Sequence, residues 1–373
     1  MAVEAVEAML PYLTNSGSFA NAASSQHSYD LNAASAIDKA RSEMANGLHC
    51  NPKDIIFTSG ATESNNLAIN GFMLSNQTQG NHIVTSAREH KSVLDCCRYL
   101  ETQGINVTYL QPDRDGLLTM DSILNALTDK TVLVSLMHVN NETGVMQDIE
   151  HIPHLLAAKG IAFHVDAAQS AGKVPLDLSA IPIDFLSLSA HKFYGPKGIG
   201  CLYIRNRKNT QLKPLHYGGG QEYGLRPGTL PTHQIISMAE AFTLACARQE
   251  TDAEHCWLVR QTLHHALAKL EGVHWHGNQQ QTVPHTVNIS FDGVSADALL
   301  IALRDHVAMS TGSACNSGAF EPSHVLRAMG IEGDELYGAI RISFGRYTTI
   351  NEIEQAGQNI CEAVIRLRQL AAA

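Results

Sequence analysis

Residues 131–139 read TVLVSLMHV, an apolar run in which valine and leucine follow one another without regular alternation with polar residues. A strand that is covered on both faces has this composition, and such strands are typical of parallel sheets. Helix-like stretches at 62–76 and 91–103 separate further runs of this kind, so the sequence predicts an α/β domain with a mainly parallel, seven-stranded sheet. The other runs are DIIFTS (54–59), HIVTS (82–86), VTYLQ (107–111), IAFHVDA (161–167), DFLSLSA (184–190) and GCLYIR (200–205). The short turn between the last two predicts one antiparallel pair.

The pattern changes after about residue 232. Two long helix-like stretches follow, and then HTVNISFDG (285–293) alternates, with Val287, Ile289 and Phe291 on one side. Alternation of this kind predicts a strand with one buried face. We therefore expect a larger domain over residues 1–245 and a smaller α+β domain over residues 246–373.

The composition excludes several classes of protein. A formal net charge of -10 argues against a broad nucleic-acid footprint, so we expect no direct nucleic-acid partner. The sequence contains no run of 18 apolar residues, so we expect no membrane span. The first residues lack the basic region of a secretory signal. The eight cysteines form no CxxC pair and the 19 histidines show no ligand spacing. We expect no structural metal, no disulfide framework and a cytoplasmic location.

Lys192 lies in SLSAHKFYGPKGIG (187–200), directly after a predicted strand. Such a lysine is usually a surface residue, but a desolvated lysine forms Schiff bases with carbonyl compounds such as pyridoxal phosphate (PLP). PLP would also need a phosphate site, and TSGATESNN (58–66) runs from a strand through glycine into a helix N-terminus. The hydroxyl of Thr62 suits that anion site, although Thr62 and Ser64 equally suit a capped helix without a ligand.

Four more polar residues follow predicted strand ends. Asp166 ends an apolar strand, where a carboxylate needs a cation such as a pyridinium as its partner. Gln169, three residues on, could contact the ring hydroxyl, His90 could stack on the ring, and Asn141 follows a further strand. Open α/β sheets bind ligands at the carboxyl ends of their strands, so these residues predict one site.

At this point the chain resembles the class V aminotransferase group, and within it the NifS/IscS-type cysteine desulfurases. The resemblance implies the PLP-dependent transferase fold type I, with a short N-terminal segment packing on the smaller domain. It rests on TSGATESNNLAI, EHKSVLDCCR, MHVNNETGVMQDI, HVDAAQSAGK, SAHKFYGPKGIG, GGGQEYGLRPGTLP, TGSACNSG and EPSHVLRAMG, which span residues from about 55 to 347.

The resemblance assigns roles around the PLP ring. Lys192 forms the Schiff base and takes the substrate's Cα proton. His90 stacks on the ring and acts in acid–base steps. Asp166 pairs with the pyridine nitrogen, Gln169 contacts the phenolic oxygen, and Asn141 supports ring and substrate.

The same resemblance implies which residues bind the phosphate of the cofactor and how the subunits are arranged. Ala61, Thr62, Ser189 and His191 belong to the cofactor-binding set, the last three at the phosphate. Thr229 would reach the phosphate of the neighbouring subunit, which implies a homodimer.

Cys315, in STGSACNSGAF (310–320), is implied as the nucleophile. Its thiolate attacks the sulfur of L-cysteine, alanine leaves, and a persulfide remains for an acceptor or scaffold protein. The acceptor pathway stays open between iron–sulfur cluster assembly, tRNA thiolation and DNA phosphorothioation. We expect His90 to take the thiol proton, and Arg341, with Arg346 as a second candidate, to bind the substrate carboxylate.

Two alternatives remain. A selenocysteine lyase or another class V aminotransferase would share Lys192 and Asp166. The second alternative is a non-catalytic homologue. It is supported by the absence of the YLDNAATTP-like segment with which members of the family usually begin. In FANAASSQHSYD (19–30), Ala20, Ala22 and Asp30 also replace the expected glycine, proline and glycine.

Overall fold

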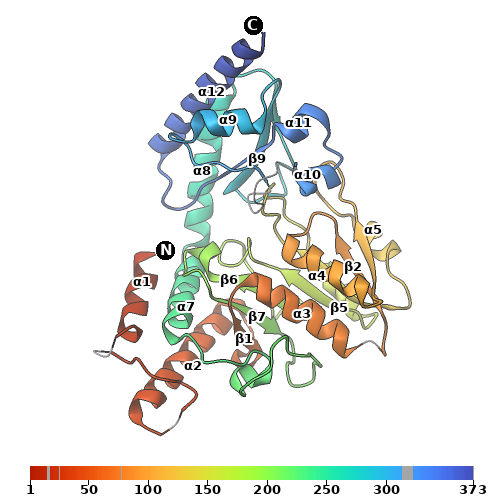
Figure 1. Ribbon diagram of the computed structural model, residues 1–373, viewed down its shortest axis with the longest axis vertical. Coiled ribbons are helices and arrows are strands. Elements are labelled where there is room, and N and C mark those ends of the chain that lie inside the picture. Colours follow the sequence, from red (N-terminus) through yellow and green to blue (C-terminus); the bar gives the residue numbers. More distant parts are fainter. Residues whose placement is uncertain (15–16, 25, 77, 313–321, 373) are drawn as a thin grey trace.

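The computed structural model describes residues 1–14, 17–24, 26–76, 78–312 and 322–372. A seven-stranded sheet forms its larger part, in the order β1-β7-β6-β5-β4-β2-β3 (Figure 1). The strands from β6 to β3 pair in parallel, whereas β7 pairs antiparallel with both β6 and β1. The predicted α/β fold, mainly parallel sheet and antiparallel pair are confirmed. The strands are β1 (Ile55–Thr58), β2 (His82–Ser86), β3 (Asn106–Leu110), β4 (Thr131–Met137), β5 (Ala162–Asp166), β6 (Phe185–Ser189) and β7 (Gly200–Ile204).

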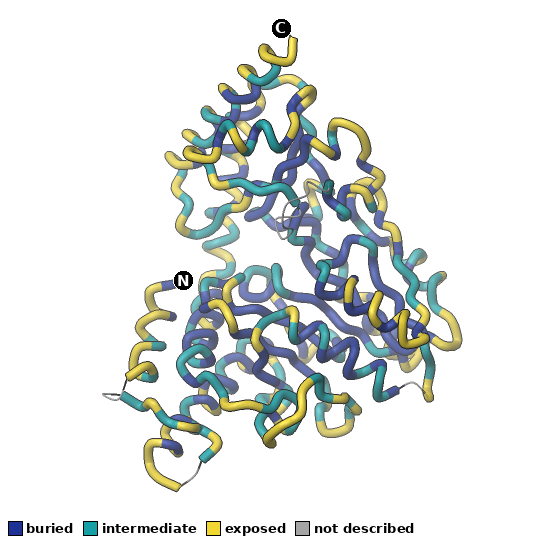
Figure 2. Tube along the Cα trace, viewed as in Figure 1, coloured by how far each residue is buried: buried dark blue, intermediate teal, exposed yellow. Residues whose placement is uncertain are grey.

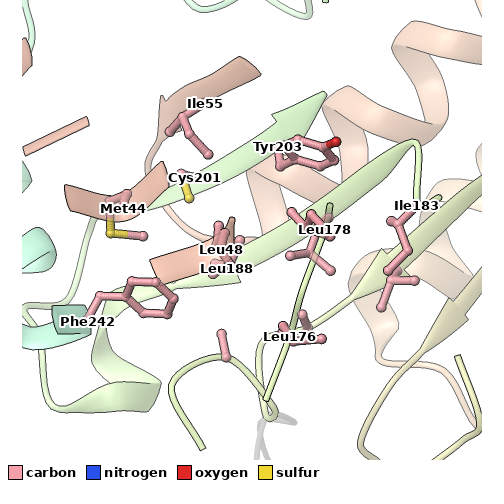
Figure 3. Packing of buried hydrophobic residues seen from close by; sticks show 14 of the residues in the cluster. Met44, Leu48, Ile55, Leu176, Leu178, Ile183, Leu188, Cys201, Tyr203 and Phe242 are labelled. Carbon is pink, nitrogen blue, oxygen red and sulfur yellow. The ribbon is translucent and has the colours of Figure 1, made fainter. Parts of the chain in front are cut away.

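Helices cover both faces of this sheet, which is why every residue of β1, β2, β4, β6 and β7 is buried. Along β6, Leu188 packs into the cluster that contains Phe242 (Figure 3). Leu186 belongs to the same cluster, whereas Phe185 packs into the cluster on the opposite face. Successive side chains of a strand point to opposite faces, so the two clusters sandwich the sheet. The helical elements of this part are α2 (Ser28–Leu48), η2 (Pro52–Asp54), α3 (Ala61–Ser75), α4 (Lys91–Thr102), α5 (Met120–Asn125), α6 (Ile152–Ala157), η3 (Ala190–Phe193), η4 (Gln221–Gly224) and α7 (Thr232–Ala247).

A three-stranded antiparallel sheet in the order β10-β9-β8 forms a second core, which Figure 2 shows as a separate group of buried residues. The predicted strand at 285–293 is confirmed as β9, but all six of its residues are buried, because β9 is the central strand of the sheet. The helix α8 begins directly after α7, and the domain boundary at 245/246 stays a prediction. The elements are α8 (Gln249–Leu267), β8 (Val273–Trp275), β9 (Thr286–Phe291), α9 (Ala296–Leu303), α10 (His324–Ala328), α11 (Gly333–Tyr337), β10 (Ile340–Ser343) and α12 (Ile350–Ala372).

The N-terminal segment lies elsewhere than expected. Its helix α1 (Val3–Met9), followed by η1 (Leu10–Tyr12), packs along α7 rather than on the smaller sheet and its helices (Figure 1). Ala2 and Ala5 are fully buried, and the Ser237 hydroxyl donates to the Ala5 carbonyl at 2.6 Å. The expectation was wrong because these two small side chains let α1 approach α7 closely. No helix in the described ranges is long and apolar enough to cross a membrane.

Candidate active site

A cavity of about 590 Å³ opens where β4, β5 and β6 end and α3 begins. Its walls also come from the segments after β2 and β4 and from β10 of the smaller sheet. Sequence reasoning predicted one site at the carboxyl ends of the strands, and the structure brings ten of the predicted residues into this cavity. They are Ala61, Thr62, His90, Asn141, Asp166, Gln169, Ser189, His191, Lys192 and Arg341.

Lys192 is positioned by a sharp turn that follows β6. The chain enters η3 after Ser189 and leaves it at Tyr194, which has a left-handed backbone (φ 67°). The Ser189 hydroxyl and the His191 Nδ1 lie 3.0 Å apart at the start of this turn. Strand β7 then returns so close to β1 that a side chain on Gly200 would meet the Cα of Gly60 at 2.6 Å. Lys192, in the turn between β6 and β7, lines the cavity wall.

Asp166 is a buried carboxylate held by two donors. Its Oδ1 accepts the backbone N–H of Ala168 at 2.9 Å, and its Oδ2 accepts an Asn65 Nδ2 hydrogen at 2.8 Å. The side chain is buried and still lines the cavity. Both carboxylate oxygens are thus held by hydrogen bonds, which fix the orientation of the side chain at the cavity.

His90 ends the segment after β2 and caps α4. Its Nδ1 accepts the backbone N–H of Ser92 at 3.1 Å. Burial lowers the pKa of His90, and the charges of Lys192 and His324 lower this pKa further. The carboxylates of Asp166 and Glu142 act in the opposite direction but do not reverse the shift. The imidazole is therefore neutral at pH 7.

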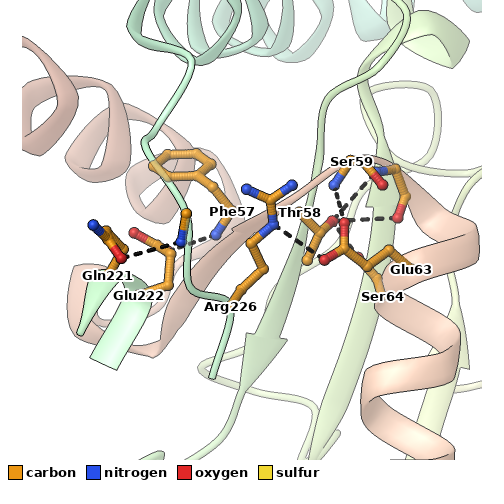
Figure 4. A network of polar contacts seen from close by, with 10 residues as sticks. Phe57, Thr58, Ser59, Glu63, Ser64, Gln221, Glu222 and Arg226 are labelled. Carbon is orange, nitrogen blue, oxygen red and sulfur yellow. Dashed lines mark hydrogen bonds and ion pairs between the residues drawn. The ribbon is translucent and has the colours of Figure 1, made fainter. Parts of the chain in front are cut away.

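The N-terminus of α3 forms the other end of the cavity. Gly60 is the residue before the first turn, with a φ of 149°, and Ala61 and Thr62 line the cavity. Thr62 does not cap the helix, and the Glu63 carboxylate accepts the Ser59 N–H at 2.5 Å (Figure 4). N–H groups in a first helical turn lack acceptors within the helix, which suits them to bind a phosphate.

Arg341 and Arg346, the two candidates for a carboxylate site, lie in different surroundings. Arg341 lines the cavity, donates from Nη1 to the Asn141 carbonyl at 3.0 Å, and has a buried Nε without a partner among the described residues. Arg346 instead pairs with Asp252 at 2.6 Å and stacks on Tyr194. Only Arg341 therefore faces the cavity.

Thr229 lines an open groove of about 950 Å³ rather than the cavity itself. The two spaces share Ser59, Thr62 and Glu63, so Thr229 lies just beyond the helix N-terminus.

A buried ion pair anchors the segment that leads to Thr229. Within it, Arg41 Nη2 lies 2.6 Å from Glu222 Oε1. Glu222 Oε2 also accepts the Phe57 N–H at 2.6 Å (Figure 4).

Cys315 and the predicted loop around it lie outside the described residues. On one side of that gap Gly312 lines the cavity, and on the other side the Ser323 hydroxyl donates to Glu142 Oε2 at 2.5 Å. A Cβ on Gly312 would lie 2.7 Å from Glu142 Cδ and still closer to its Oε2. The Glu142 carboxylate thus lies against Gly312, the last described residue before the gap, and Ser323, the second described residue after it.

Sequence reasoning missed Asn65, Ser92, Glu142 and His324. The Asn65 amide bonds to residues 27 and 101 positions away, and Glu142 bonds to a residue 181 positions away. No local pattern signals such pairs. His324 also lines the cavity and its Nε2 lies 2.9 Å from the Glu89 carbonyl.

Comparison with known proteins gives the family. Residues 2–356 match the family described as Aminotransferase class-V. The chain belongs to the class-V aminotransferase family. A curated relative, cysteine desulfurase IscS of Vibrio vulnificus (strain YJ016), is 49% identical over 365 residues, which cover 98% of this chain and 90% of the relative.

Solved structures of class-V relatives share the fold. A NifS-like protein has a TM-score of 0.89 at 31% identity and covers 100% of this chain and 96% of its own. SspA, solved in complex with cysteine, has a TM-score of 0.82 at 38% identity, with coverage of 94% and 97%.

Proposed function

We propose that this class-V protein is a PLP-dependent cysteine desulfurase that converts L-cysteine to L-alanine and transfers the sulfur, as a persulfide on Cys315, to an acceptor protein. One observation carries the proposal. A single cavity combines a lysine after a strand end, a buried carboxylate and a helix N-terminus, and Gly312 on its wall lies three residues before Cys315. The similarity to IscS supports the same reaction.

The residues present fit PLP. Asp166 offers a buried, doubly hydrogen-bonded carboxylate to a pyridine nitrogen. The first turn of α3 offers N–H groups to the phosphate, and Lys192 lines the same cavity. When bound, PLP acts as an electron sink for the amino acid attached to it.

The chain's own groups would bind the substrate and move its protons. The guanidinium of Arg341 binds the carboxylate of cysteine, using the buried Nε that has no acceptor among the described residues. The Nζ of Lys192 would hold the cofactor and, once free of it, would take the proton from the substrate Cα.

Sulfur transfer forms one bond and breaks another. The Cys315 thiolate attacks the substrate sulfur, an S–S bond forms, and the Cβ–S bond breaks. The electron pair of the broken bond stays on the carbon, which is protonated to give alanine. Three residues span at most about 10 Å, so the tether from Gly312 keeps Cys315 within reach of the cavity.

The test uses purified protein loaded with PLP. We expect absorbance of a lysine-bound cofactor, and alanine and sulfide from L-cysteine with a reductant. Cys315→Ser should retain the absorbance but form no persulfide. A loaded protein that forms no alanine contradicts the proposal. Faster turnover of selenocysteine than of cysteine would favour a selenocysteine lyase, and keto-acid formation an aminotransferase.

The partners are part of the proposal. Because Thr229 lies beyond the helix N-terminus in an open groove, a second copy of the chain could bring its own Thr229 to this phosphate site, as the resemblance implies. Light scattering of the loaded protein tests the homodimer. The sulfur-acceptor protein and the cytoplasmic location stay predictions, and capture of proteins that accept radioactive sulfur from Cys315 would identify the acceptor.

A further inference from the structure

Four polar residues form an unbroken chain of hydrogen bonds from Asp166 to His90. The Asn65 Nδ2 lies 2.8 Å from Asp166 Oδ2 and 2.9 Å from Ser92 Oγ. The Ser92 Oγ in turn lies 2.9 Å from His90 Nδ1. Asn65 is fully buried, and Ser92 is buried and lines the cavity, so this chain joins two functional side chains of the cavity.

The carboxylate fixes the direction of every donor in this chain. Asp166 can only accept, so Asn65 must turn its NH₂ group toward it, and the second hydrogen of that group goes to Ser92 Oγ. With its oxygen thus accepting from Asn65, the Ser92 hydroxyl has its own hydrogen left for His90 Nδ1. The reverse orientation would place the Asn65 carbonyl oxygen against the carboxylate.

A second contact points the same way. The backbone N–H of Ser92 also donates to His90 Nδ1, at 3.1 Å. A hydrogen on Nδ1 would face this N–H group directly. Two donors therefore converge on Nδ1, and a neutral imidazole then carries its hydrogen on Nε2.

We propose that Asn65 and Ser92 are positioning residues that hold His90 as the neutral tautomer with its proton on Nε2. His90 then offers a proton to the cavity and has no lone pair there with which to take one. This reverses the expectation that the resting His90 accepts the proton of Cys315. The hydrogen-bond assignment stands on geometry alone, whereas its consequence for turnover rests on the proposed function.

Histidine tautomers can be read directly by ¹⁵N NMR of protein labelled in its imidazole rings. We expect the His90 signals, assigned with a His90→Gln variant, to show a protonated Nε2 and an unprotonated Nδ1 from pH 7 to 9. The spectra are recorded on the PLP-loaded protein and repeated without PLP. A protonated Nδ1 in the wild type overturns the proposal.

Three substitutions test the chain of donors. Ser92→Ala removes one donor and should raise the population with a proton on Nδ1, whereas Ser92→Thr, which keeps the hydroxyl, should restore the wild-type spectrum. Asn65→Asp replaces the donor by an acceptor that draws the Ser92 hydrogen away, so it should shift the tautomer further. Ser64→Ala removes a buried hydroxyl from the same helix outside this chain and serves as the matched control.

Kinetics supply the second readout. Ser92→Ala should lower kcat at least about tenfold with little change in KM, because general acid–base groups contribute about 10²–10⁴-fold. A Ser92→Ala spectrum identical to that of the wild type overturns the proposal even if Asn65→Asp does not fold. Because the spectrum requires no turnover, a protein that makes no alanine refutes the proposed function and leaves the tautomer assignment to be judged separately.

Discussion

Gly312→Ala tests how the chain is held at the border of the segment that contains Cys315. The added Cβ would lie 2.7 Å from Glu142 Cδ and 3.1 Å from Ser323 Cβ, with Glu142 Oε2 closer still. The carboxylate must therefore move away, and its hydrogen bond from the Ser323 hydroxyl at 2.5 Å is lost. Hydrogen bonds to charged groups contribute about 1.5–3 kcal/mol, so we expect the free energy of unfolding in urea to fall by about 2 kcal/mol.

A double-mutant cycle separates this mechanism from a general effect of alanine. Glu142→Ala removes the same hydrogen bond and also leaves room for the Cβ, so Gly312→Ala should cost little in that background. We expect a coupling of about 1–2 kcal/mol between the two sites. Gly220→Ala is the matched control, because Gly220 has an ordinary φ of -85° and no atom within 4 Å of its added Cβ. Additive costs, or no cost in the wild-type background, would refute the reasoning.

The same variant should separate substrate binding from sulfur transfer. Gly312 lies three residues before Cys315, so a displaced border residue misplaces the nucleophile rather than the lysine or the carboxylate. A misplacement of about 1 Å can cost about 10²-fold in rate. We expect a 10- to 100-fold slower single-turnover release of alanine. The spectral change on adding cysteine should keep its wild-type midpoint. Weaker cysteine binding without a slower step would refute this placement of the effect.

Three further predictions follow from the site. Arg341→Lys should raise the KM for cysteine about 10- to 100-fold through loss of a bidentate contact. Arg346→Lys removes the guanidinium that stacks on Tyr194 and weakens the pair with Asp252, so it should lower the melting temperature and leave this KM unchanged; equal KM effects would contradict the assignment. Asp166→Asn keeps the size of the side chain but removes its charge, so PLP should bind more weakly in a titration followed by absorbance; unchanged affinity would argue against a pyridinium partner. Burial raises the pKa of Glu89 to about 8, and the charge of Asp166 contributes to this rise. Between about pH 4.5 and 8 the folded chain therefore binds more protons than the unfolded chain. The stability of the wild type falls as the pH rises through this range. The stability of Glu89→Gln relative to the wild type should therefore grow by a few kcal/mol from pH 5 to 8 and then level, as measured by urea unfolding; a difference that does not vary with pH would contradict the burial of a protonated carboxyl.

The sequence predicted the sheet because strands that are buried on both faces consist mainly of apolar residues, and such runs can be recognised in the sequence. The run at 131–139 contains β4, and the polar residues after β5 and β6 meet in one cavity because parallel strands end at the same edge. These inferences needed only local pattern and one rule of topology. The predicted site residues that line the cavity are accordingly mostly those that follow strand ends.

What the sequence did not reveal depends on partners far apart along the chain. Asn65 and Ser92 lie on two different helices and are ordinary helical residues in the sequence, and only the packing of α3 against α4 joins them. The position of α1 likewise depends on how the buried side chains of Ala2 and Ala5 pack against α7. The sequence also did not reveal that the Ser92 N–H donates to His90 Nδ1, and the expected role of His90 as a proton acceptor stays a prediction.

The position of Gly312 on the cavity wall has a consequence for competition with other thiols. A tether of three residues spans at most about 10 Å, so Cys315 stays within about that distance of Gly312. The attack proposed for Cys315 is therefore an intramolecular step, whereas a small thiol in free solution must first diffuse into the cavity. The covalent connection alone thus makes the local concentration of this thiol independent of the thiols in solution, before any difference in thiol reactivity.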